Sequence, residues 1–116
     1  MDQKQAIRQF NYPVKDLVQA KKLYSRLLGV EPYVDSPYYV GFRVGGQEIG
    51  LDPNASSMGI SGPVPFIEVE GVKATLEGLV AAGAQVVQEP LDVGRGMLVA
   101  YFKDGEGNVT GLVQKP

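Results

Sequence analysis

The chain has 116 residues, of which 44% are hydrophobic and 21% are charged, and its net charge at pH 7 is −2. This size and composition predict one soluble globular domain, and the lack of a basic excess argues against a nucleic-acid partner. The chain contains no cysteine and no histidine, which excludes disulfides, thiolate catalysis and imidazole ligands. Its polar start and the absence of a long apolar stretch predict no membrane span, and we expect a cytoplasmic protein.

The first half of the chain opens with a strand and a helix. Residues 6–14 alternate between apolar and polar side chains, which predicts a strand. Asp16 is the expected N-cap of a helix that begins at Leu17, where apolar residues start to recur at helical spacing. Gly29 follows the last apolar position and predicts a left-handed C-terminal stop.

A hairpin and a linker complete this half. Residues 38–44 and 47–51 form β-like runs on either side of Gly45-Gly46, a strong signal for a two-residue hairpin turn. We interpret module one, residues 1–52, as β-α-β-β-β, with these two runs as its last two strands. Residues 53–63 are rich in turn formers and have no periodicity, so we interpret them as a linker.

The second half, module two at residues 64–116, repeats the same order. Its expected elements are a strand at 64–70, a helix at 72–82 that ends at Gly83, and strands at 85–88, 97–103 and 109–114. The helix starts Asp16 and Gly71 lie 55 positions apart, whereas the closing pairs Gly50-Leu51 and Gly111-Leu112 lie 61 apart. The sequence thus predicts an α+β fold of two βαβββ modules, with an ordinary α+β sandwich as the alternative.

Four stretches of the chain form an ordered set of motifs: Tyr-Pro-Val-Lys-Asp-Leu at 12–17, Phe-Ile-Glu-Val-Glu at 66–70, Ala-Ala-Gly-Ala at 81–84 and Phe-Lys-Asp-Gly-Glu-Gly-Asn at 102–108 with the closing strand. Together they resemble the vicinal oxygen chelate superfamily, which includes glyoxalase I, extradiol dioxygenases and bleomycin-resistance proteins. The resemblance implies that the sheets of the two modules curve around a shared cleft, as a single domain over 1–116. It also implies a homodimer.

Metal-dependent members of this superfamily hold a divalent ion in that cleft, with ligands from the first and last strands of each module. The resemblance places these ligand positions at Gln9, near Gly50, at Val64 and at Gly111. Glycine and valine have no donor side chain, and one neutral amide cannot hold a catalytic ion. We therefore expect no metal, no other cofactor and no catalytic residue. The position near Gly50 is the exception that stays open, because the metal-ligating residue there could instead be Glu48 or Asp52.

Strand alternation places acidic and aromatic side chains on the faces that the resemblance turns toward the cleft, which suits a cationic or aromatic ligand. The candidate ligand-binding residues are Gln9, Asn11, Tyr39, Phe42, Glu48, Asp52, Phe66, Glu68, Arg95 and Tyr101. Tyr33 and Tyr38 are further aromatic residues that we expect at the cleft, whereas Arg43 is interpreted as a surface or dimer-interface charge. The alternatives are that the carboxylates are solvated strand residues or bind a hard cation, and that Arg95 is an exposed loop residue.

The leading hypothesis from the sequence is a metal-free small-molecule binder that resembles the bleomycin-resistance branch. Two alternatives remain open at this point. One is a metal-dependent lyase, isomerase or dioxygenase with a displaced site on Glu48, Asp52, Glu68 or Gln9. The other is a structural or regulatory dimer whose cavity is filled by its own side chains.

Overall fold

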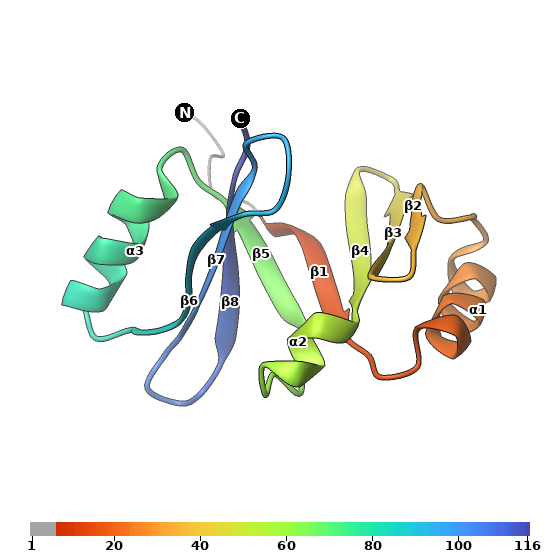
Figure 1. Ribbon diagram of the computed structural model, residues 1–116, viewed down its shortest axis with the longest axis horizontal. Helices are drawn as coiled ribbons and strands as arrows, with labels where there is room; N and C mark the ends of the chain where they lie inside the picture. The colour runs from red at the N-terminus through yellow and green to blue at the C-terminus, as the bar shows by residue number, and fades with distance from the viewer. Residues whose placement is uncertain (1–6) are drawn as a thin grey trace. The chain divides into compact units, whose positions relative to one another are not determined.

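The computed structural model describes residues 7–116, so the predicted strand start at Ala6 lies outside the described residues. The chain divides into two compact units, one formed by Arg8–Val64 and one containing Pro65–Pro116. The first module consists of β1 (Ile7–Pro13), α1 (Leu17–Leu28), β2 (Val34–Ser36), β3 (Tyr39–Val44) and β4 (Gln47–Asp52) (Figure 1). The second consists of β5 (Val64–Glu68), α3 (Val72–Ala81), β6 (Gln85–Asp92), β7 (Leu98–Lys103) and β8 (Val109–Gln114). The predicted α+β class and the two βαβββ modules are confirmed.

Both ends of α1 are determined by local sequence. The Asp16 side chain accepts a hydrogen bond from the Gln19 backbone N–H at 3.0 Å, which satisfies one of the free donors of the first turn. Gly29 ends the helix with a φ of 72°, and its N–H donates to the Ser25 carbonyl. Below the helix, Val40, Phe42 and Leu51 form a buried cluster, so α1 covers one face of this sheet.

The helix α3 has no side-chain cap of its own, because glycine occupies its N-cap position. The donor of its first residue is instead satisfied from the end of the chain, where the Gln114 Oε1 accepts a hydrogen bond from the Val72 N–H at 2.8 Å. The helix packs on Ala100 and Leu112 through Val72 and Leu76. The last strand therefore both forms the core below α3 and caps this helix.

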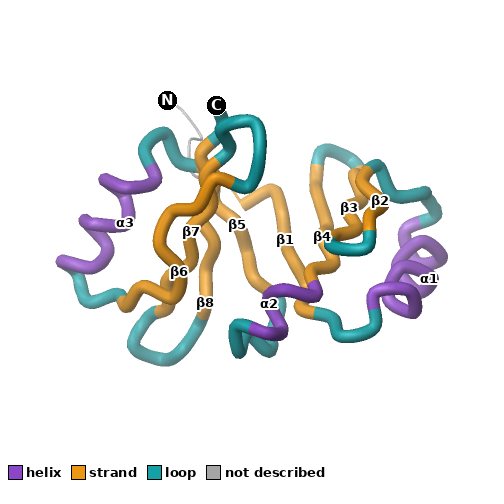
Figure 2. Tube along the Cα trace, viewed as in Figure 1, coloured by secondary structure: helices purple, strands orange, loops and turns teal. Residues whose placement is uncertain are grey.

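The strands of the two units share one topology, with the spatial order β2-β3-β4-β1 in one unit and β6-β7-β8-β5 in the other (Figure 2). In each of them the first strand of the module lies parallel to the last strand, and the other pairs are antiparallel. The registers are equivalent too, because Asn11 pairs with Gly50 and Phe66 pairs with Gly111. These pairs reproduce the offsets of 55 and 61 positions between the halves, so the internal repeat extends to single residues.

Two segments differ from the sequence-based expectation. The predicted linker begins with a short helix, α2 (Pro53–Ser57), because Asp52 caps it through the Asn54 N–H and proline occupies its first turn. The strand β6 is longer than the expected 85–88 and runs to Asp92 despite Pro90. It lies at the edge of its sheet and has register irregularities around Gln88, where a residue without an N–H is tolerated. No helix in the described part of the chain is long and apolar enough to span a membrane.

Gly50 and Gly111 occupy equivalent positions, and in both cases an aromatic side chain lies where a Cβ would stand. A Cβ at Gly50 would overlap the Tyr39 Oη and the Asn11 Oδ1 and would lie 2.7 Å from the Tyr39 Cζ. A Cβ at Gly111 would lie 2.5 Å from the Phe66 Cε2. The missing side chains are therefore a packing requirement, since real Cβ atoms do not approach heavy atoms this closely.

We predict that Gly50→Ala destabilises the protein by roughly 1–3 kcal/mol, because the added methyl forces Tyr39 and Asn11 out of their positions. Urea denaturation monitored by circular dichroism measures this loss. Gly62→Ala is the matched control, since nothing lies within 4 Å of a Cβ at Gly62 and its φ is not positive. Equal stability of the wild type and Gly50→Ala would contradict the close packing.

Candidate functional site

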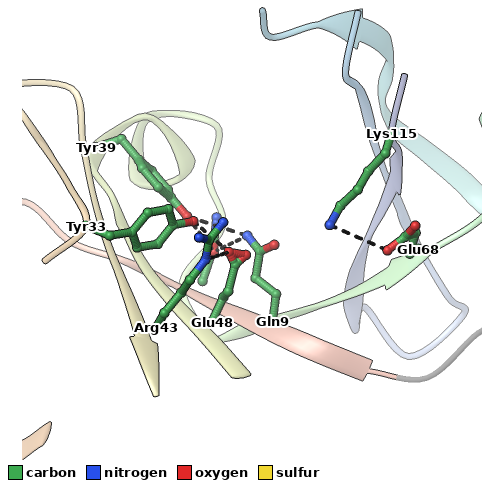
Figure 3. A network of polar contacts seen from close by, with 8 residues as sticks. Gln9, Tyr33, Tyr39, Arg43, Glu48, Glu68 and Lys115 are labelled. Atoms are coloured by element: carbon green, nitrogen blue, oxygen red, sulfur yellow. Dashed lines mark hydrogen bonds and ion pairs between the residues drawn. The ribbon is translucent and has the colours of Figure 1, made fainter. Parts of the chain in front are cut away.

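The face of β1, β3 and β4 that points away from α1 carries a set of polar side chains, which we call the polar face. Its members are Gln9, Asn11, Tyr33, Tyr39, Arg43 and Glu48. Since Tyr12, Phe42 and Leu51 pack on the α1 side, strand alternation places their neighbours on the opposite side. Figure 3 shows the labelled members of this set pointing toward one another from β1, from the loop before β2, from β3 and from β4.

A neutral hydrogen-bonded cluster covers Gly50. The Gln9 Nε2 donates to the Asn11 Oδ1 at 3.0 Å, and the Tyr39 hydroxyl donates to the same oxygen at 3.4 Å. A third, longer hydrogen bond of 3.5 Å joins the Gln9 Nε2 to the Tyr39 Oη. Asn11 is only 5% exposed, and its hydrogen bonds offset the cost of burying an amide. This arrangement requires glycine at position 50, because any side chain there would displace the Tyr39 hydroxyl and the Asn11 amide.

A second cluster on the polar face combines an aromatic ring, a carboxylate and a guanidinium. The Tyr33 hydroxyl donates to the Glu48 Oε2 at 2.6 Å, and the Arg43 Nε lies 3.5 Å from the same oxygen. The Arg43 guanidinium lies over the Tyr33 ring, 4.0 Å from its centroid. The ring is positioned by a backbone hydrogen bond from Tyr33 to the Gly41 carbonyl at 2.9 Å and by the absence of a side chain at Gly41.

The electrostatics of this cluster keep the Tyr33 phenol protonated. Burial is the largest cause of a pKa raised to about 12, and the hydrogen bond to Glu48 and the charge of that carboxylate raise it further. The Arg43 guanidinium acts in the opposite direction but does not cancel these effects. Tyr33 is therefore a lasting hydrogen-bond donor to Glu48 at neutral pH.

We predict that the Tyr33 pKa is about 12 in the folded protein, against 10.0 for an ordinary tyrosine. Because the folded form holds this proton more tightly than the unfolded chain, its contribution to stability is present below pH 10 and is lost as the pH rises through 12. NMR titration of ¹³Cζ-labelled tyrosine measures the value. In Glu48→Gln the pKa should fall while staying above the ordinary value, since burial remains. A Tyr33 pKa near 10 in the wild type would contradict both the burial of the phenol and its hydrogen bond to Glu48.

The corresponding face of the C-terminal unit has a different chemistry. The Phe66 ring lies over Gly111 and meets the Tyr101 ring edge-on, with the two centroids 5.5 Å apart. Both aromatic residues are buried. At the end of β5, Glu68 is exposed and lies 3.7 Å from the Lys115 Nζ (Figure 3). This face is therefore aromatic where the polar face has its amide cluster.

The structure brings four of the ten predicted ligand-binding residues together on the polar face: Gln9, Asn11, Tyr39 and Glu48. Phe42 is not among them, because it is fully buried in the core on the α1 side of the sheet. Asp52 shares the strand of Glu48, but its carboxylate caps α2.

Arg95, another predicted ligand-binding residue, lies in the exposed loop between β6 and β7. Its φ is 57°, an uncommon left-handed conformation for a residue other than glycine. The loop is closed by a hydrogen bond from the Val93 N–H to the Met97 carbonyl at 2.9 Å. The geometry of the C-terminal unit thus places Arg95 at a hairpin tip.

Two members of the polar face, Tyr33 and Arg43, were outside the predicted set. Arg43 could have been found from the Gly45-Gly46 turn, because a two-residue hairpin pairs Val44 with Gln47 and hence Arg43 with Glu48. Tyr33 was named only as one of several aromatic residues, because strand alternation does not apply to the loop before β2, where it lies. Its position depends on the backbone hydrogen bond to Gly41.

The carboxylates proposed as a displaced metal site do not form one in this structure. Within residues 7–116, no group of three or more acidic residues is arranged to hold a metal ion. Glu48 is held by Tyr33 and Arg43, Asp52 caps α2, and Glu68 lies beside Lys115. Each of these three carboxylates therefore already has a partner within its own unit.

Solved structures with the same fold cover nearly the whole chain at low identity. A hypothetical protein from Bacillus halodurans is 16% identical with a TM-score of 0.75, over 98% of this chain and 96% of its own. Methylmalonyl-CoA epimerase, in complex with methylmalonyl-CoA and NH4+, is 15% identical with a TM-score of 0.71, over 96% and 94%. No curated protein sequence matches the chain significantly.

A third similar structure is a glyoxalase/bleomycin resistance protein/dioxygenase superfamily member from Vibrio splendidus. It is 13% identical with a TM-score of 0.71, over 96% of this chain and 99% of its own. The family model of the same superfamily matches residues 6–112, which confirms the resemblance found in the sequence. The chain therefore belongs to the glyoxalase/bleomycin resistance protein/dioxygenase superfamily.

Proposed function

We propose that this protein binds a small molecule on the polar face without a metal ion and without transforming it. The observation that carries the proposal is the filled space at Gly50, where the Tyr39 hydroxyl and the Asn11 amide stand in the place of a side chain. By the resemblance, this is a position from which metal-dependent members supply a ligand. A histidine or glutamate here would require the amide cluster to be dismantled.

The second module supports the same proposal. At Gly111, which the repeat makes equivalent to Gly50, the Phe66 ring fills the space of a side chain, and an aromatic ring is no ligand for a divalent ion. Val64 at the opening of β5 has no donor atom, and Gln9 is engaged with Asn11. Three of the four family positions thus lack a donor, and the fourth holds a neutral amide.

The chemistry of the polar face favours a cationic or aromatic ligand. The residue Tyr33 is 46% exposed, and its ring provides a surface on which a ligand can stack. The Glu48 carboxylate lies next to this ring. The amide cluster beside them presents neutral donors and acceptors that orient a polar group. A homodimer and a cytoplasmic location, both expected from the sequence, belong to the same proposal.

No contact favours the enzymatic alternative on Glu48, Asp52, Glu68 or Gln9. Each of these side chains already has a structural partner, as described above. The likeness to methylmalonyl-CoA epimerase, at 15% identity, is a likeness of fold. Sequestration by shape and charge is the simpler use of this face.

A calorimetric screen of cationic and aromatic small molecules tests the proposal. We expect a compound that binds with the same affinity in the presence and absence of EDTA, and whose dissociation constant rises about tenfold in Glu48→Gln and in Tyr33→Leu. Glu106→Gln is the control, because this exposed carboxylate lies in the turn between β7 and β8. Circular dichroism verifies that the variants are folded.

Three outcomes would contradict the proposal. One is binding that EDTA abolishes. Another is a hit whose affinity is unchanged in both polar-face variants. The third is conversion of the bound compound to a product.

A further inference from the structure

The Tyr33 ring and the Glu48 carboxylate are both contacted by a cationic side chain of the protein itself. Arg43 makes both contacts that a planar cationic ligand would make there, with its guanidinium stacked over the Tyr33 ring and its Nε facing the Glu48 Oε2. The centroid distance of 4.0 Å is well inside the range of cation–π attraction. The geometry of a bound guanidinium can thus be seen directly in the structure.

Arg43 is held loosely, whereas its two partners are positioned firmly. The Arg43 side chain is 67% exposed, and its ion pair with Glu48 spans 3.5 Å. Exposed ion pairs of this kind contribute little, because water screens them and a long side chain must be ordered. By contrast, Tyr33 and Glu48 are joined by a hydrogen bond of 2.6 Å, and Tyr33 is fixed to the Gly41 backbone. The contacts that position Tyr33 and Glu48 therefore do not involve Arg43.

The backbone keeps Arg43 next to this subsite at all times. Arg43 and Glu48 are cross-strand partners in the β3–β4 hairpin, one pair removed from the residues that flank the Gly45-Gly46 turn. Both turn glycines have positive φ, which fits a tight two-residue turn and fixes the register. Arg43 thus competes at a high local concentration with any external cation.

We propose that Tyr33 and Glu48 form a subsite for a planar nitrogen cation, a guanidinium or amidinium group, and that Arg43 occupies it until such a ligand displaces it. This inference rests on the proposed function and adds the ligand class and the residue that sets the affinity. Planarity matters because a flat, weakly hydrated cation stacks on the ring, whereas a compact ammonium keeps its water. A ligand that binds here must repeat the contacts of Arg43 or exceed them.

Benzamidine, a flat amidinium attached to a phenyl ring, is the probe for the first test. In Arg43→Gln we expect about tenfold tighter binding of benzamidine than in the wild type, because the internal competitor is gone. Arg26→Gln on α1 removes the same charge away from the polar face and controls for the general effect of charge. The gain should disappear in the double variant Arg43→Gln/Glu48→Gln.

An NMR titration of the wild type tests displacement without relying on any variant. The Arg43 Nε–Hε resonance should move on addition of benzamidine, as the guanidinium leaves the Tyr33 ring current, while that of Arg26 stays in place. An unmoved Arg43 resonance at saturating benzamidine overturns the inference. So does a gain in Arg43→Gln no larger than that in Arg26→Gln, or no benzamidine binding in either protein.

The two proposals fail in different ways. If a compound from the screen binds without metal and depends on Glu48, but its affinity and that of benzamidine are insensitive to Arg43, only the displacement inference fails. If nothing binds to the wild type or to Arg43→Gln, both proposals fail.

Discussion

The parallel pairing of the first and last strands of each module is the constraint on which the site depends. In the N-terminal unit this pairing sets Asn11 beside Gly50, and the hairpin places Gly41 on the other side of Gly50. These two adjacent glycines have no side chains, and two tyrosines pack against them: Tyr39 lies over Gly50, and Tyr33 and Tyr39 both contact Gly41. The hydroxyl groups of these tyrosines then bind Asn11 and Glu48, and this creates the polar face.

The internal repeat shows how one backbone carries two chemistries. Asn11 and Phe66 are equivalent by register, as are Gly50 and Gly111, yet one pair belongs to an amide cluster and the other to an aromatic pair. In both units the glycine of the last strand, Gly50 or Gly111, leaves room for a side chain from a neighbouring strand. The backbone geometry is thus shared, whereas the identity of the side chain over the glycine decides between polar recognition and apolar packing.

Local signals made most of the fold predictable. The Asp16 cap, the Gly29 stop and the Gly45-Gly46 turn each act within a few residues, so the sequence contains the whole cause. The start of α2 was missed, although Asp52-Pro53 is a local signal of the same kind. The α3 cap could not be predicted this way, because its acceptor, Gln114, is 42 residues from Val72 in the sequence.

The candidate site was predictable only in part, for the same reason. Alternation along single strands identified Gln9, Asn11 and Glu48, whereas Tyr39 and Phe42 were chosen because they are aromatic. Tyr39 and Phe42 lie three positions apart in β3, so alternation places them on opposite faces, and Phe42 is the one that faces α1. The role of Tyr33 depends on a loop conformation and on Gly41, and neither has a periodic signature.

Metal content is the measurement that tests the central claim most directly. The purified protein is incubated with Zn, Ni, Mn, Fe(II) and Mg, freed of unbound ions, and examined by elemental analysis and thermal unfolding. The filled positions at Gly50 and Gly111 predict no stoichiometric metal and no shift of Tm for any ion. About one equivalent of a divalent ion with a stabilising shift would contradict the account and show that the chain retains a chelating site.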